Sequence, residues 1–360
     1  MITKKEIKEL NEISTKTPTV SLYLNTDQKY YTPEQILINQ KNLLRKVKDL
    51  VGEENYNFIL DKVGLGLEKD IKGVALFVNP RENISYIYKF SKPFPNQIHT
   101  ENNLHLKPLL SLLDEYERYC VLLVDKEKAK VFSVYLGEIE DMTNIFNEFP
   151  GKHAQGGWSQ QGNQAHVDAH HHENLKEAAD KAFSFFKEKK FNRLIISGSK
   201  EILPELKEML HPYLQERLAG EFLIELFKSN QEILNKSLEI EESIERKKEN
   251  EQVEKLINNL GYKNKAINGL DEVLQASFEK KIMKLIVQEG LQEPGYICTN
   301  CNKLIYQQDD CAECENNKEK VEDIVDELVQ QVIAQGGEVE FVRDNKDLTK
   351  IGSIGAFLRY

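Results

Sequence analysis

The centre of the chain reads Gly151-Lys-His-Ala-Gln-Gly-Gly-Trp-Ser-Gln160, between strand-like sequence and a His-rich segment. The adjacent glycines Gly156 and Gly157 give up side-chain packing, so they indicate unusual backbone angles or a close approach to another molecule. We interpret the stretch as a loop whose backbone reaches a substrate. A surface loop without a function of its own is the alternative interpretation.

Strand and helix patterns alternate around the glycine pair and predict an α/β domain over residues 116–260. Before the pair, apolar residues over 119–124 and 129–135 predict a β-hairpin with a charged turn. After it, we expect a loop that extends to residue 172, a helix over 173–190 and a strand over 193–197. Alternating strands and helices are typical of a layered α/β fold.

Residues 1–115 predict a separate α+β domain. The alternation over 19–24 predicts a strand, and the helical spacing of apolar residues over 34–51 predicts a helix. Two further apolar runs, 73–78 and 84–90, predict a strand pair across a turn-rich connection.

Residues 261–360 predict a third domain of mixed α/β type. Helices are expected over 269–278 and 321–334, and strands over 282–287 and 338–342. A chain of 360 residues exceeds the usual size of a single core, which agrees with three domains.

Four of the five cysteines form two Cys-x-x-Cys pairs, Cys298 with Cys301 and Cys311 with Cys314. Two such knuckles place four thiolates within tetrahedral reach, so we predict a zinc ribbon over 296–316 that binds one structural Zn²⁺. Because cysteine fills all four positions, no coordination site is left open for catalysis by the metal. An iron–sulfur centre and a pair of redox-active thiols are the alternatives.

Several histidines lie on or near the central stretch, and we interpret them as part of a solvated, RNA-facing loop. Consecutive histidines point in different directions, so a metal site in the tract is the less favoured alternative. These histidines are His153, His166, His170, His171 and His172.

Charge and composition limit the possible partners and the location. The net charge of −11 at pH 7 argues against general affinity for nucleic acid, so any RNA contact must be local. No apolar run approaches the length of a membrane span, and the clustered cysteines argue against a secreted disulfide framework. We therefore expect a cytoplasmic protein without a membrane partner, and a buried core thiol at Cys120.

Two sets of motifs resemble one family. Lys152-His-Ala-Gln-Gly-Gly157, followed by His172-Glu-Asn-Leu-Lys-Glu-Ala-Ala-Asp180, is similar to the central domain of the archaeal and eukaryotic class 1 peptide chain release factors. In that family a Lys-His-x-x-Gly-Gly-Gln loop leads into a helix. Gly269-Leu-Asp-Glu-Val-Leu274, Asp323-Ile-Val-Asp-Glu-Leu328 and Ile351-Gly-Ser-Ile-Gly-Ala-Phe-Leu-Arg-Tyr360 are similar to its third domain. Among the members, which include the Pelota proteins, the chain most resembles the bacterial archaeo-eukaryotic release factor families.

The resemblance implies a fold and a set of partners. It implies an RNase-H-like central domain and a ribosomal-protein-like α/β sandwich as the last domain. It also implies a factor that enters the ribosomal A site, contacts rRNA and peptidyl-tRNA, and docks onto a translational GTPase. A monomer is expected for a factor that must fit the tRNA-sized A site.

The resemblance also assigns roles to residues of the central stretch. Gly156, Gly157 and Gln160 would form the tip that promotes hydrolysis of peptidyl-tRNA. Lys152, His153 and Trp158 would contact rRNA or tRNA; an aromatic ring such as that of Trp158 can stack on a base.

Two departures from the family pattern separate the possible functions. In a gapless alignment Trp158 occupies the position of the family's glutamine, and Gln160 arrives two residues later. Residues 1–115 lack the Asn-Ile-Lys-Ser and Tyr-x-Cys motifs that read stop codons in the family, so we do not expect stop-codon reading. The expected function is ribosome binding at the A site in translation termination or ribosome rescue, and the displaced glutamine leaves hydrolysis of peptidyl-tRNA open. The alternatives are a non-catalytic hibernation factor that occupies the A site, and a three-domain protein of unrelated function.

Overall fold

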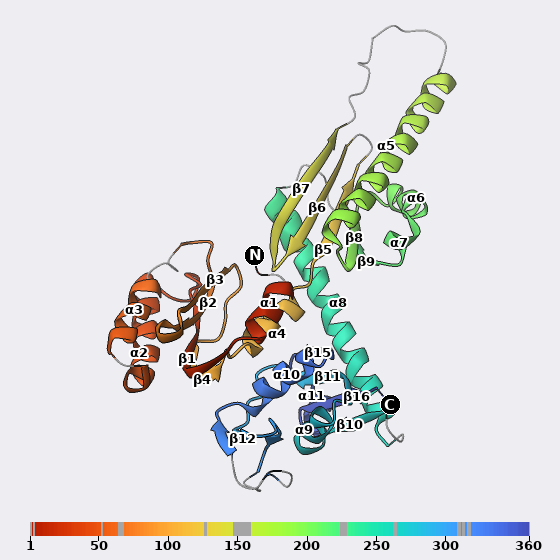
Figure 1. Ribbon diagram of the computed structural model, residues 1–360. Coiled ribbons are helices and arrows are strands. Elements are labelled where there is room, and N and C mark those ends of the chain that lie inside the picture. Colours follow the sequence, from red (N-terminus) through yellow and green to blue (C-terminus); the bar gives the residue numbers. More distant parts are fainter. Residues whose placement is uncertain are drawn as a thin grey trace. The chain divides into compact units, whose positions relative to one another are not determined.

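The computed structural model describes residues 2, 4–51, 53–63, 68–125, 128–146, 160–223, 229–261, 265–307, 311, 314 and 318–359. These residues form a multidomain α/β protein with four sheets (Figure 1). The chain divides into two compact units, one of residues 1–115 together with 247–360, and one of residues 116–246. Among the described residues no helix has both the length and the apolar character that crossing a membrane requires.

The unit of residues 116–246 is built on a five-stranded sheet in the order β7-β6-β5-β8-β9. Strands β5, β6 and β7 form an antiparallel meander, whereas β8 and β9 continue from β5 in parallel. The predicted hairpin and the strand after the helix are confirmed. The bounds are β5 Tyr119–Val124, β6 Lys128–Tyr135, β7 Glu138–Phe146, β8 Arg193–Ser197 and β9 Leu218–Phe222.

Helices cover both faces of this sheet because successive strand residues point to opposite sides. Cys120 and Leu122 lie in the core formed with α5, α6 and α7, which confirms Cys120 as a buried thiol. Tyr119 and Val121 lie in the core formed with the first part of α8. The helices are α5 Gln160–Lys189, α6 Ile202–Met209, α7 Pro212–Gln215 and α8 Asn230–Asn259.

Helix α5 begins at Gln160, so the predicted start at residue 173 is wrong. The predicted loop is also wrong for His166 and His170–His172, which lie within the helix. The hydrophobic pattern missed this part because polar residues dominate the sequence before Leu175, which is buried against the sheet. The preceding turns have no proline and consist mostly of residues that a helix tolerates.

The first sheet of the other unit has four antiparallel strands in the order β3-β2-β1-β4. Helices α2 and α3 pack on one of its faces. The strands and the helix predicted for this region are confirmed, whereas the polar strand β4 was not predicted. The bounds are α1 Lys4–Asn11, β1 Ser14–Asn25, α2 Pro33–Val51, α3 Glu53–Val63, β2 Gly73–Asn79, β3 Ile84–Phe90, β4 Gln97–Asn103 and α4 Lys107–Glu115.

The second sheet of this unit has the order β10-β16-β11-β15, with β15 parallel to β11 and β16 antiparallel to it. Helices α9 and α10 cover one face, and the last part of α8 and α11 cover the other. The predicted helices and strands are confirmed, although α10 begins at Ile324 instead of residue 321. The bounds are β10 Ala266–Asn268, α9 Leu270–Phe278, β11 Ile282–Gln288, α10 Ile324–Ala334, β15 Glu338–Val342, α11 Lys346–Lys350 and β16 Ile354–Leu358.

A glycine in each unit lets α8 lie close to the sheet beneath it. A Cβ atom added to Gly220 of β9 would lie 2.9 Å from Ile240 Cγ2. A Cβ atom added to Gly355 of β16 would lie 2.6 Å from Leu256 Cδ2 and 2.9 Å from the carbonyl oxygen of Ile267. Neither distance is compatible with a side chain at that position unless the neighbouring atoms shift.

Candidate metal centre and the glycine-pair segment

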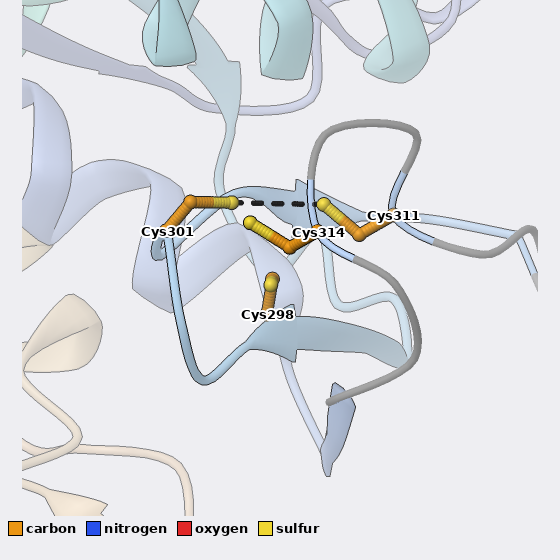
Figure 2. Close-up of side chains that lie close together, drawn as sticks. All are labelled: Cys298, Cys301, Cys311 and Cys314. Atoms are coloured by element: carbon orange, nitrogen blue, oxygen red, sulfur yellow. Dashed lines mark hydrogen bonds between the residues drawn. The ribbon is translucent and has the colours of Figure 1, made fainter.

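The four cysteines of the predicted ribbon converge on one point, as Figure 2 shows. Their Sγ atoms all lie within 4.8 Å of one another, and the Sγ atoms of Cys301 and Cys311 are 3.6 Å apart. Cys298 and Cys311 are buried, whereas Cys301 and Cys314 are half-buried. The structure therefore brings together all four residues that the spacing selected.

A small sheet and a tight turn position the first pair. Strands β12 Gly295–Cys298, β13 Leu304–Ile305 and β14 Lys318–Val321 form a sheet in the order β13-β12-β14. Cys298 is the last residue of β12, and its carbonyl oxygen accepts a 2.8 Å hydrogen bond from the Asn302 N–H. Asn302 has φ of +58°, a conformation that asparagine tolerates better than most residues. This turn points both Cys298 and Cys301 to the same side.

Backbone dipoles favour the thiolate form of Cys298. The N–H groups of Cys301 and Asn300 act on its sulfur and lower its pKa to about 7. The Asn300 side-chain Nδ2 also donates to Cys314 Sγ at 3.4 Å. Burial raises the pKa of the Cys301 thiol to about 12, so the stabilised thiolate is at Cys298. Among the described residues the group consists of four sulfur atoms with no donor of another kind, which fits a tetrahedral metal of the zinc type.

Most of the glycine-pair segment lies outside the described residues. Lys152, His153, Gly156, Gly157 and Trp158 fall in that part, so the roles predicted for them stay predictions. Gln160 is the first residue of α5, and only its backbone is described.

Helix α5 is anchored by its later turns. Among the α5 side chains that the structure describes, those from Leu175 to Phe185 that are buried pack on the five-stranded sheet. The turns that start at Gln160 extend beyond the strands of that sheet (Figure 1). Gln160, at the start of the helix, therefore lies away from the core of its unit.

The structure gives one histidine of α5 a partner that the sequence did not indicate. His172 Nδ1 lies 3.1 Å from Glu205 Oε1 on α6. The two residues are too far apart in sequence for a local motif to connect them. Several of the tract's side chains, His166 and His170 among them, lie outside the described part of the structure, so the expectation for the tract stays a prediction.

Two family models match consecutive parts of the chain. The model of bacterial archaeo-eukaryotic release factor family 10 matches residues 105–242, and the model of eRF1 domain 3 matches residues 246–360.

The chain is also similar to individual archaeal proteins. Peptide chain release factor subunit 1 of Methanocaldococcus jannaschii is 27% identical over 328 residues, which cover 84% of this chain and 78% of the relative. The factor of the same name from Archaeoglobus fulgidus is 26% identical over 315 residues, 81% of this chain and 77% of the relative. Among solved structures, archaeal Pelota in a ribosome-bound model with ABCE1 is 13% identical with a TM-score of 0.45, over 99% of this chain and 94% of that one.

Proposed function

Because the chain belongs to the archaeo-eukaryotic release factor superfamily, we propose that it binds the ribosome, enters the A site and acts in translation termination or ribosome rescue. The observation that carries the proposal is the pair of consecutive family matches over residues 105–242 and 246–360. The similarity to archaeal release factors over 84% of the chain supports it. The ribosome-bound state of archaeal Pelota is a property of that protein, and we extend it to this chain as part of the proposal.

The proposal retains three domains, residues 1–115, 116–260 and 261–360. The antiparallel meander β5–β7 continued by parallel β8 and β9 supports an RNase-H-like interpretation of the second domain. The third domain would be the ribosomal-protein-like sandwich, and we propose that it docks a translational GTPase.

The reaction proposed for the central stretch is hydrolysis of peptidyl-tRNA. A water molecule attacks the ester carbonyl carbon, the bond from that carbon to the tRNA ribose oxygen breaks, and the ribose oxygen takes up a proton. Gly156 and Gly157 would let the backbone approach the ester, and an N–H group there would stabilise the developing oxyanion. Gln160 would position the water. The extension of α5 beyond its sheet supports this role because a long helix can carry such a tip away from the domain core.

Contacts with RNA are proposed for Lys152, His153 and Trp158. The lysine would contact phosphate, and the indole of Trp158 would stack on an exposed base, an interaction that contributes about 1–3 kcal/mol per base. The second candidate function, A-site occupation without hydrolysis, is favoured by one feature, which is Trp158 at the position of the family's glutamine.

We also propose that the four cysteines bind one structural Zn²⁺. Cys298, Cys301, Cys311 and Cys314 would supply all four ligands, and the ion would stabilise a small sheet that has little core of its own. The ion would take no part in hydrolysis, because a site of four cysteine ligands leaves no position for water.

The deciding experiment measures peptide release and protein binding in the same tubes. Purified ribosomes that hold labelled peptidyl-tRNA and an empty A site are mixed with the protein, and released peptide and bound protein are both counted. Release in proportion to binding supports the hydrolase. Stoichiometric binding without release supports the A-site occupant, and the absence of binding contradicts both.

A matched pair of variants tests the proposed tip. Gln160→Ala should lower the release rate at least tenfold with unchanged binding if Gln160 positions the water. Gln161→Ala, the next residue of α5, serves as the control and should retain release. A fully active Gln160→Ala protein would remove Gln160 from the mechanism.

A further inference from the structure

A second group of candidate metal ligands lies in the unit of residues 1–115 and 247–360, apart from the cysteines. Glu101, His105 and Asp326 each offer a ligand atom, and these atoms lie within 4.8 Å of one another. Glu101 belongs to β4, His105 lies between β4 and α4, and Asp326 lies in the first turn of α10. The side chains of His105 and Asp326 are completely buried.

Several polar atoms of this group have no hydrogen-bond partner. Neither ring nitrogen of His105 makes a hydrogen bond, and neither does Glu101 Oε2. His105 Nδ1 makes an ion-pair contact of 3.4 Å with Asp326 Oδ2 when the imidazole is protonated, so the atoms without a partner of either kind are His105 Nε2 and Glu101 Oε2. Buried polar atoms in folded proteins are almost always paired, so each such exception calls for an explanation. A bound ion at the point where these atoms converge supplies one.

Three oxygen atoms of the two carboxylates accept hydrogen bonds that hold the carboxylates in place. Asp326 Oδ1 accepts from the backbone N–H of Lys107 at 2.6 Å, and its Oδ2 accepts from Gln330 Nε2 at 2.6 Å. Glu101 Oε1 accepts from the backbone N–H of Glu322 at 3.2 Å, which leaves Oε2 for the ion. Contacts of this kind orient ligands in known metal sites.

His105 is fixed in the same way. Its backbone N–H donates to Ser21 Oγ at 3.0 Å, and its carbonyl oxygen accepts from the Tyr23 hydroxyl at 2.6 Å. Its ring stacks on the ring of His99, with centroids 3.6 Å apart and planes 10° apart. The backbone and the ring plane are therefore set. Nε2 has no hydrogen-bond partner, and Nδ1 has only the 3.4 Å contact with Asp326 Oδ2.

The charges around the group also favour a cation. The ammonium group of Lys107 is engaged by Asp323 and by the Leu291 carbonyl oxygen. Glu327, next to Asp326, is bonded by the uncharged amide of Asn103. Glu101 and Asp326 place two carboxylates within 4.8 Å of each other, and Asp326 also pairs with His105 Nδ1 at 3.4 Å. A divalent ion would take the place of the proton on the imidazole and compensate both carboxylates.

We propose that Glu101, His105 and Asp326 bind one divalent transition-metal ion. One imidazole with two carboxylates suits Mn²⁺, Fe²⁺ or Zn²⁺, whereas Ca²⁺ and Mg²⁺ prefer oxygen ligands alone. The ion would join a segment near residue 100 to a helix near residue 326, and its role would be to hold these two parts of the unit together.

Mn²⁺ is the probe for this site because four thiolates do not favour it. The full chain is titrated with Mn²⁺, and free Mn²⁺ is measured by electron paramagnetic resonance. One bound equivalent per chain is expected, and Glu101→Gln should weaken binding at least tenfold. Glu319→Gln, which changes a nearby exposed carboxylate, is the control and should bind as the unchanged protein does.

A second variant removes the imidazole. His105→Ala should also weaken Mn²⁺ binding at least tenfold, with circular dichroism used to confirm that the protein is folded. If this variant does not fold, the near-isosteric Glu101→Gln decides the question. The absence of a one-equivalent Mn²⁺ site, or equal affinity in Glu101→Gln and the unchanged protein, overturns the proposal.

Discussion

Arg193, the first residue of β8, links this strand to helix α8 through buried ion pairs. Its side chain is 11% exposed, and its two terminal nitrogens bond Glu241 and Glu245, which are 5% and 2% exposed. Glu117 Oε2 lies 3.9 Å away as a third acidic neighbour. One guanidinium therefore compensates several carboxylates that water reaches poorly, and the raised pKa of Arg193 agrees with a permanent charge there despite the burial.

Arg193→Ala should destabilise the unit of residues 116–246 by about 3–5 kcal/mol, because it leaves buried carboxylates without a cation. The change is measured as the loss of hydrogen-exchange protection at the amides of β5 and β8. Lys236→Ala is the control, since Lys236 and Glu239 form a pair with 51% and 65% exposed side chains. This control should cost at most about 1 kcal/mol. Equal losses in the two variants would contradict the role of Arg193.

The cysteines give a second prediction for single residues. Cys298→Ser should remove one equivalent of bound zinc per chain, measured by atomic absorption after dialysis, because the site loses one of its four sulfur atoms. Cys120→Ala should retain that zinc, since Cys120 is buried in a different core. Zinc content that is the same in Cys298→Ser and in the unchanged protein would contradict the proposed centre.

Among the elements, α8 is one that depends on small neighbours. Gly220 of β9 faces Ile240, and Gly355 of β16 faces Leu256, and each glycine leaves room for a branched side chain of the helix. Leu256 is completely buried. At each of these two places the helix packs closely on the sheet because a glycine of the strand leaves room for a large side chain of the helix.

The pair Gly355 and Leu256 should show non-additive energetics. Gly355→Ala should destabilise its unit by about 1–3 kcal/mol through overpacking, and Leu256→Ala by about 2–5 kcal/mol through a cavity. The double variant should lose less than the sum, because the added methyl group then occupies part of the cavity. Unfolding of the unit is followed by hydrogen exchange in β11 and β16.

Gly290 provides the control for this cycle. A Cβ atom added to Gly290 would have no neighbour within 4 Å, so Gly290→Ala acts only through its φ of +79°. Its cost should add to that of Leu256→Ala within about 0.5 kcal/mol. Additive losses for Gly355→Ala and Leu256→Ala would show that the short contact is relieved in another way.

At the scale of the whole molecule, one unit is assembled from both ends of the chain. Residues 1–115 and 247–360 share it, and α10 of the last part is covered by the first part. Gln330 Nε2 donates to the Leu104 carbonyl oxygen at 2.8 Å, and Asn103 Nδ2 donates to Glu327 at 3.2 Å. The interior of the unit therefore depends on contacts between residues more than 200 positions apart.

A chain that lacks residues 1–115 should lose protection from amide hydrogen exchange in its own unit and keep it in the unit of residues 116–246. Removal of these residues uncovers Asp326, Glu327 and Gln330 on α10, so amide exchange in α10 should accelerate. Exchange in β5 and β8, which belong to the other unit, should stay close to that of the full chain. Unchanged exchange in α10 would contradict the shared unit.

The sequence predicted the elements whose apolar residues follow a clear period, and it predicted the cysteine cluster. Strands β2 and β5 are apolar runs, and the two Cys-x-x-Cys pairs are local motifs, so no long-range information was needed. Strand β4 and the first turns of α5 were missed because polar residues dominate both. Glu101, His105 and Asp326 could not be found in this way, since only the fold brings residue 101 next to residue 326.

The discontinuous unit has a consequence for biosynthesis. Residues 1–115 are synthesised before α10, so the residues of the four-stranded sheet are made before the helix that they contact in this unit. At a synthesis rate of about 5–20 residues per second, roughly 10–40 s separate the synthesis of His105 and Lys107 from that of Asp323 and Asp326. The unit of residues 116–246 is continuous and can fold during that interval. Until α10 has been synthesised, the surface of residues 1–115 that contacts this helix stays exposed. A chaperone that binds exposed surface would therefore act mainly during this interval.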